Sequence, residues 1–111
     1  MIGNAPHPEG PDVFEALADP TRRWMLAKLA REGAQTPTRL AGDLPISRQA
    51  VSRHLAVLQR SKLVTVQSIG REQRYQLSPA PLDDATAWIR ELELAWDSRL
   101  VALAQLLANE K

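Results

Sequence analysis

The chain has 111 residues, of which 44% are hydrophobic and 24% are charged, and its formal net charge is +1. This length and composition predict one soluble domain. There is no apolar run of 18 residues and no secretory signal pattern, and the absence of cysteine excludes disulfides and thiolate metal ligands. We therefore expect a cytoplasmic protein with no membrane partner.

The charges are unevenly distributed along the chain. Residues 39–74 hold seven basic residues against two acidic ones, a net charge of +5. The remaining residues hold seven basic against eleven acidic ones, a net charge of −4. This asymmetry predicts one surface for a polyanion and a second surface with a different task.

The first elements follow from proline, glycine and cap residues. Residues 1–11, MIGNAPHPEGP, contain three prolines and two glycines without apolar periodicity, which predicts a disordered tail. A short helix is expected over about 12–18. A second helix is expected to begin with Asp19 as its cap and Pro20 in its first turn, and to end at Gly33.

Two further helix starts and a hairpin occupy the middle of the chain. Thr36 before Pro37 is a helix cap, and Ser47 is a second cap, after which Val51 forms a hydrophobic staple with Ile46. Beyond residue 62 the apolar period changes from 3.6 to 2. The segments LVTVQSI and RYQLS, with GRE as the turn between them, predict a β-hairpin.

The last predicted element is a helix over about 81–108, roughly 40 Å long at ~1.5 Å per residue. Its apolar residues recur in steps of three or four, and a domain this small has little core to cover them. We expect them to pack on a twofold-related copy together with the first short helix. The predicted dimer residues are Val13, Phe14, Leu17, Leu82, Ala85, Trp88, Ile89, Leu92, Trp96, Leu100, Leu103 and Leu107.

The helix after Ser47 has two distinct faces. Val51, Leu55 and Leu58 share one side and predict the core contact. The opposite side is rich in Arg, Gln and Ser, side chains that hydrogen-bond to base edges in a major groove. By itself this pattern also fits an ordinary solvated face. The preceding short helix and the following hairpin favour a helix-turn-helix with a wing.

The hypothesis assigns these polar residues two roles. Base readout is expected from Arg48, Gln49, Ser52 and Arg53. Phosphate contacts are expected from Ser47, His54, Arg60, Lys62, Arg71 and Arg74.

Three segments, ALADPTRRWML, SRQAVSRHLAVL and GREQRYQLSP, resemble the ArsR family of bacterial winged helix-turn-helix regulators. The resemblance covers residues 13–107. It implies a mainly α fold with a small β-hairpin (α+β), in which residues 12–111 form one winged helix-turn-helix domain with a long C-terminal dimerisation helix. It also implies a homodimeric, nucleoid-associated regulator of transcription that binds double-stranded DNA. Such proteins are usually repressors acting at an inverted-repeat operator near their own promoter.

The chain departs from the family in two respects. Ser61 and Lys62 replace a frequent Ala-Gly pair, which predicts a slightly different helix end. Where family members carry thiolate ligands before the recognition helix, this chain has Thr36, Thr38 and Ala41, and its last helix has carboxylates but no histidine. We therefore expect no metal, no cofactor and no metal response. Nothing resembles a catalytic constellation, so an enzyme is not expected.

Four alternatives stay open at this point. The basic face could bind an acidic protein partner, as in a winged-helix adaptor, instead of DNA. An unknown small molecule could act as inducer. Trp24, Trp88 and Trp96 are expected to be core and interface aromatics, although they could line a ligand pocket. Arg22 and Arg23 are expected to form salt bridges to acidic residues of the long helix, with DNA contact as the lesser alternative.

Overall fold

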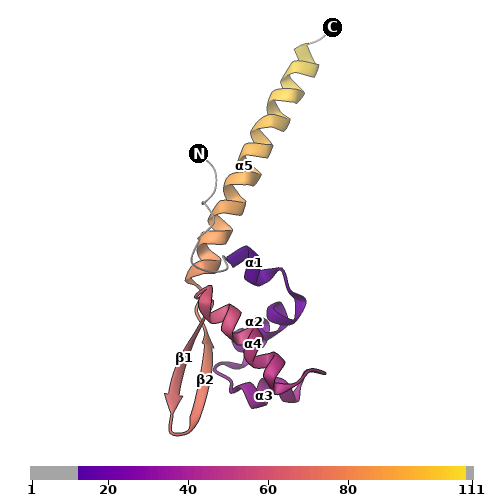
Figure 1. Cartoon of the computed structure of the whole chain (residues 1–111). Coiled ribbons are helices and arrows are strands. Elements are labelled where there is room, and N and C mark those ends of the chain that lie inside the picture. The colour runs from indigo at the N-terminus through magenta and orange to yellow at the C-terminus, as the bar shows by residue number, and fades with distance from the viewer. Residues whose placement is uncertain (1–12, 110–111) are drawn as a thin grey trace.

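The computed structural model describes residues 13–109, and the tail predicted at residues 1–11 lies outside this range. The elements are α1 (Val13–Leu17), α2 (Pro20–Glu32), α3 (Pro37–Gly42), α4 (Arg48–Arg60), β1 (Val64–Ile69), β2 (Glu72–Leu77) and α5 (Ala80–Asn109). The predicted class, mainly α with one β-hairpin, is confirmed. Helix α5 rises from a body made of the other elements, and the hairpin points away from it at the opposite end (Figure 1).

The predicted caps begin three of the four helices of the body, α2, α3 and α4. The Asp19 carboxylate accepts a hydrogen bond from the N–H of Arg22, and the Thr36 hydroxyl accepts one from the N–H of Arg39. The Ser47 hydroxyl accepts one from the N–H of Ala50 at 3.1 Å. Each cap satisfies a helical N–H that lacks an intrahelical partner, so these starts are encoded locally.

The end of α4 corrects the expectation of an altered termination. Lys62 has a φ of +64°, the left-handed conformation that glycine usually supplies. Its N–H donates to the carbonyl of Gln59, and the N–H of Leu63 donates to the carbonyl of Leu58, both bonds of a Schellman motif. Leu58 and Leu63 are both fully buried, so their burial holds Lys62 in this strained conformation.

The core lies among α2, α3, α4 and the base of the hairpin. Met25, Leu40, Val51, Leu55, Leu58 and Leu63 are all 0% exposed. They include the three residues of α4 that the sequence assigned to the core. The polar face of α4 must therefore point away from the body.

Strand β2 begins earlier than predicted, because Glu72 and Gln73 belong to it. They pair with Ile69 and Ser68 in an antiparallel register that leaves only two residues in the turn, Gly70 and Arg71. Gly70 has a φ of +62°, which suits the first central position of a type II′ turn. The three-residue turn assumed from the sequence is therefore wrong by one residue.

Two long-range contacts fasten the body around the hairpin and the turn before α4. Gln35, in the loop between α2 and α3, exchanges two main-chain hydrogen bonds of 3.0 and 2.8 Å with Tyr75 of β2. Lys28, only 5% exposed on α2, forms an ion pair with Asp43 at the end of α3 and lies 5.5 Å from the ring centroid of Trp24. These contacts anchor the segments that flank α4.

Helix α5 gives the molecule its length. Its 30 residues correspond to about 45 Å. The principal-axis extents are 73 × 28 × 20 Å, and the radius of gyration is 19.3 Å. A compact chain of this size has a radius of gyration of about 13 Å. Most of α5 therefore extends beyond the body, as Figure 1 shows.

Candidate nucleic-acid interface

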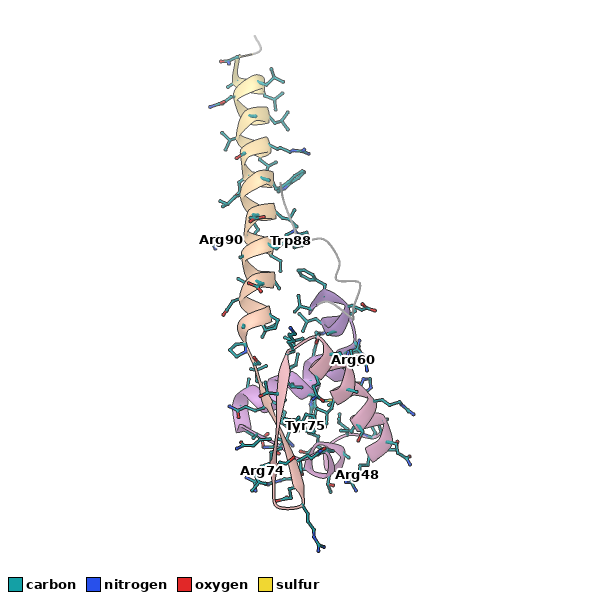
Figure 2. All side chains as sticks on the ribbon, turned by 60° about the vertical axis from the view of Figure 1, so that its left-hand side comes forward. Arg48, Arg60, Arg74, Tyr75, Trp88 and Arg90 are labelled. Carbon is teal, nitrogen blue, oxygen red and sulfur yellow. The ribbon has the colours of Figure 1, made fainter. Side chains whose placement is uncertain are left out.

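The polar face of α4 is open to solvent. Arg48, Gln49, Ser52 and Arg53 are all exposed. Arg48 lies at the end of the molecule away from α5 (Figure 2). The N-terminal half of α4 thus offers four hydrogen-bonding side chains on a rigid helix, with no part of the described chain covering them.

The hairpin carries its basic residues toward the same end. Arg71 is exposed in the two-residue turn, and Arg74 lies on β2 (Figure 2). The Arg74 guanidinium is 3.4 Å from the Glu72 carboxylate, and both side chains are about half exposed. The ion pair partly offsets the charge of Arg74, whereas Arg71 stands at the tip of the hairpin.

The remaining predicted phosphate contacts are spread over α4. Ser47 is exposed, and its oxygen already accepts the capping hydrogen bond from Ala50. Arg60 lies at the other end of α4 from Arg48, toward α5 (Figure 2), and Lys62 follows it in the left-handed turn. The sequence-predicted set therefore divides into a group at the hairpin end and a group near the base of α5.

His54 is half-buried and faces the turn between α1 and α2. Its Nδ1 lies 3.9 Å from an Asp19 carboxylate oxygen and 3.5 Å from a terminal nitrogen of Arg22. The main-chain N–H of Arg22 donates to Asp19 and, together with the positive charge of the Arg22 guanidinium, holds the pKa of Asp19 below its ordinary value. Asp19 is therefore ionised at neutral pH, where it caps α2.

Arg22 and Arg23 correct a sequence expectation. Arg22 donates to the carbonyl oxygens of Ala16 at 2.8 Å and Glu15 at 3.1 Å, and Arg23 donates to that of Leu17 at 2.7 Å. The predicted salt bridges to α5 are wrong. Both guanidinium groups donate to main-chain carbonyls at the end of α1, and the carbonyl of Glu15 also accepts from the N–H of Ala18.

The predicted dimer residues fall into two groups. Val13, Leu17 and Leu82 pack on the core, Ala85 is 6% exposed, and Phe14 meets Trp88 edge to face with ring centroids 5.1 Å apart. The other group is left uncovered, with exposed fractions between 41% and 61%: Ile89, Leu92, Trp96, Leu100, Leu103 and Leu107.

The three tryptophans lie in different surroundings. Trp24 packs on the core beside Lys28, Trp88 contacts Phe14, and Trp96 is 60% exposed farther along α5. The Trp88 Nε1–H is buried and lacks a hydrogen-bond acceptor within the described residues.

Residues 13–109 show neither of two other features, a metal-binding cluster and a membrane-spanning helix. No group of three or more His, Cys, Asp or Glu in this range is arranged to hold a metal ion. No helix in the same range is both long enough and apolar enough to cross a membrane.

A short helix, a turn and an exposed polar helix, followed directly by a basic hairpin, define a winged helix-turn-helix protein. A helix-turn-helix domain family matches residues 17–67. The HTH-type transcriptional regulator Rv2034 of Mycobacterium tuberculosis is 42% identical over 98 residues, which cover 88% of each chain. The transcriptional repressor SdpR of Bacillus subtilis is 32% identical over 78 residues, 70% of this chain and 86% of SdpR.

A solved structure supports the same class of protein. An ArsR-like transcriptional regulator from Rhodococcus sp. RHA1 superposes with a TM-score of 0.81 at 38% identity, covering 89% of this chain and 90% of the other. The chain belongs to the ArsR family of winged helix-turn-helix transcriptional regulators. It is a DNA-binding protein of that family and not an enzyme.

Sequence reasoning missed three residues that organise the site. Lys28 and Gln35 looked like ordinary polar residues, although both are buried and hold segments next to α4. Arg22 gave one signal, a cation in the first turn of a helix, where the helix dipole disfavours positive charge. That signal showed that Arg22 needs a partner but not where the partner lies.

Proposed function

We propose that the protein is a homodimeric transcriptional repressor that binds an inverted-repeat operator near its own promoter. The observation that carries the proposal is the exposed Arg/Gln/Ser face of α4 beside the arginine-bearing hairpin, at the end of the molecule away from α5. A helix of about 10–12 Å diameter fits a B-DNA major groove of about 12 Å.

In this proposal, Arg48, Gln49, Ser52 and Arg53 read base edges. Arginine bonds both acceptors of guanine, glutamine pairs with adenine, and serine accommodates either. These four residues support the assignment because they share the exposed face and are held by a helix whose other face is fully buried.

The second set supplies attraction to the phosphates. Arg71 at the tip of the hairpin suits the backbone next to the groove that α4 occupies, and Arg74, Lys62 and Arg60 extend the positive surface on either side. The Ser47 hydroxyl hydrogen and the outward side of His54 complete the set. Each phosphate contact adds to the salt dependence of binding.

The dimer is proposed to form through α1 and the uncovered apolar residues of α5. Six of them, between Ile89 and Leu107, are at least 41% exposed. A second copy is the simplest cover, and a twofold axis then presents two α4 helices to half-sites about one turn apart, ~34 Å. Repression is proposed because SdpR, a relative of this chain, is named a transcriptional repressor.

Metal is not proposed as the signal. The chain has no cysteine, and α5 has no histidine to join its carboxylates. Binding of a soft or borderline metal ion would need thiolate or imidazole donors, which are missing at these positions.

The deciding experiment is fluorescence anisotropy with the DNA upstream of the gene and with a scrambled duplex, over a series of salt concentrations. Specific regulators bind their operators about 10³–10⁷ times more tightly than random DNA, and both affinities fall steeply with salt. Equal, weak binding to both duplexes would overturn the proposal. In that event an acidic protein partner would become the better occupant of the basic face.

A further inference from the structure

One side chain joins the helix that begins the predicted dimer interface to the helix predicted to read DNA. Arg22 donates from Nε to the carbonyl of Ala16 and from one terminal nitrogen to the carbonyl of Glu15, both in the last turn of α1. Its other terminal nitrogen lies 3.5 Å from Nδ1 of His54, on α4. A single guanidinium group therefore contacts both α1 and α4. It meets them at Ala16 and His54, which are 38 residues apart in the chain.

The guanidinium group is itself held in place. The main-chain N–H of Arg22 donates to the Asp19 carboxylate at 2.9 Å, which fixes the backbone from which the side chain extends. The same carboxylate lies 3.9 Å from His54 Nδ1. The N–H donors of a guanidinium group lie in one plane at fixed angles. Fixing one of its contacts therefore also fixes the directions of the other two.

The chain of contacts continues into α5. The ring of Phe14 on α1 packs against Trp88 on α5, and Ala16 on α1 and Ala85 on α5 are both buried. Packed rings, main-chain carbonyls and one guanidinium group thus connect α5 to α4 without a gap. Such contiguous contacts are able to carry energetic coupling between sites.

We propose that Arg22 is a positioning residue for DNA recognition. It fixes the reading helix relative to the dimerisation helices, so that both α4 helices of a dimer reach their half-sites together. This inference rests on the proposed function. It adds that affinity for a full operator depends on a residue that contacts no DNA.

The contact with Arg22 selects one tautomer of a neutral His54 ring. Guanidinium nitrogen only donates, so Nδ1 of a neutral His54 acts as the acceptor and the ring proton resides on Nε2. The same contact that positions α4 therefore leaves an N–H on the far side of the ring. That N–H is the group available to a phosphate oxygen.

The test compares two duplexes, one with both half-sites and one with a single half-site whose partner sequence is scrambled. The measured quantity is the ratio of full-site to half-site affinity. For Arg22→Gln we expect this ratio to fall about tenfold, with half-site affinity within about twofold of wild type, the size of effect seen for coupling residues. Sedimentation should show an unchanged dimer.

The matched control is Arg23→Gln. Arg23 also donates to a carbonyl of α1, that of Leu17, in a hydrogen bond that does not involve α4. The ratio should stay at the wild-type value. An equal fall for both variants would assign the effect to the end of α1 alone and would overturn the link through His54.

Variants of His54 test the link from the other side, including the case in which Arg22→Gln does not fold. Asparagine places its amide near the position of Nδ1 and glutamine near that of Nε2. His54→Asn should therefore keep the ratio, even if both affinities fall through loss of a phosphate contact, whereas His54→Gln should lower it. The opposite pattern would overturn the proposal.

The two proposals fail in different ways. If the wild-type protein does not distinguish its upstream DNA from scrambled DNA, the proposed function fails, and the role of Arg22 fails with it. If the wild type discriminates but Arg22→Gln loses affinity equally on full and half sites, only the positioning role is overturned. Unchanged affinity on both duplexes would also overturn it.

Discussion

The body and α5 differ in how they bury apolar surface. In the body, leucines such as Leu40, Leu55 and Leu58 are 0% exposed, because three helices and a hairpin close around them. On α5, leucines such as Leu103 and Leu107 are 52% and 61% exposed. One chain therefore buries the core of the winged helix-turn-helix body but leaves a large exposed apolar surface on α5.

The largest expected effect breaks the body. Leu55→Ala removes a fully buried side chain from α4 and should lower the free energy of unfolding by about 2–5 kcal/mol. Chemical denaturation at several protein concentrations would measure it. The loss should be the same at each concentration, because the cavity lies within one chain. A loss below ~1 kcal/mol would contradict the packing described here.

The next prediction concerns the exposed apolar residues of α5. Leu103→Glu should raise the dimer dissociation constant by at least about thirtyfold, since a charge would replace a leucine of the proposed interface. Analytical ultracentrifugation gives the constant, and circular dichroism should show a folded body.

Leu94→Glu is its control. Leu94 is 59% exposed and lies nine residues before Leu103, which is about half a turn round an ideal helix. It should dimerise as the wild type does. If both variants dissociate, or neither does, the predicted seam on α5 is incorrect.

A third prediction concerns recognition of DNA rather than folding. Gln49→Ala should weaken binding to the cognate site by about 1–3 kcal/mol, leave random DNA binding unchanged and relax the preference at one base pair. By contrast, Arg71→Ala should weaken binding to both duplexes and flatten the salt slope. Anisotropy on a set of single-base operator variants would check both. Equal losses for Gln49→Ala on cognate and random DNA would remove it from base readout.

A smaller effect depends on pH. Asp19→Ala removes the α2 cap and should cost about 1 kcal/mol of stability at neutral pH. The folded pKa of Asp19 lies below its ordinary value, so its contribution is complete above the unfolded pKa and is lost as pH falls through the folded pKa. Denaturation of both proteins should therefore converge in acid. A constant difference down to the lowest pH would contradict this account.

The smallest effect should stabilise the body. Lys62→Gly relieves a left-handed non-glycine residue and should raise the free energy of unfolding by about 0.5–1 kcal/mol. The same variant should lose part of the salt dependence of DNA binding if Lys62 contacts phosphate. Thermal denaturation measures the first effect and anisotropy the second. A loss of stability would mean that the lysine stem packs favourably in the turn.

The sequence by itself determined the local structure. Asp19, Thr36 and Ser47 begin their helices through hydrogen bonds to residues three positions later, and the apolar periods of α4 and α5 were readable because they repeat within a few residues. The winged helix-turn-helix class followed from the order of these elements. The length of the turn at Gly70, in contrast, was set by the pairing of the two strands.

The tertiary structure alone decided which distant groups meet. The contacts of Arg22 with His54, Lys28 with Asp43 and Gln35 with Tyr75 join residues 32, 15 and 40 positions apart. It also decided that Ala85 is covered by its own chain while Leu100 is not. Caps and periods are set by neighbours along the chain, whereas these contacts exist only after the helices have packed, and no local pattern records them.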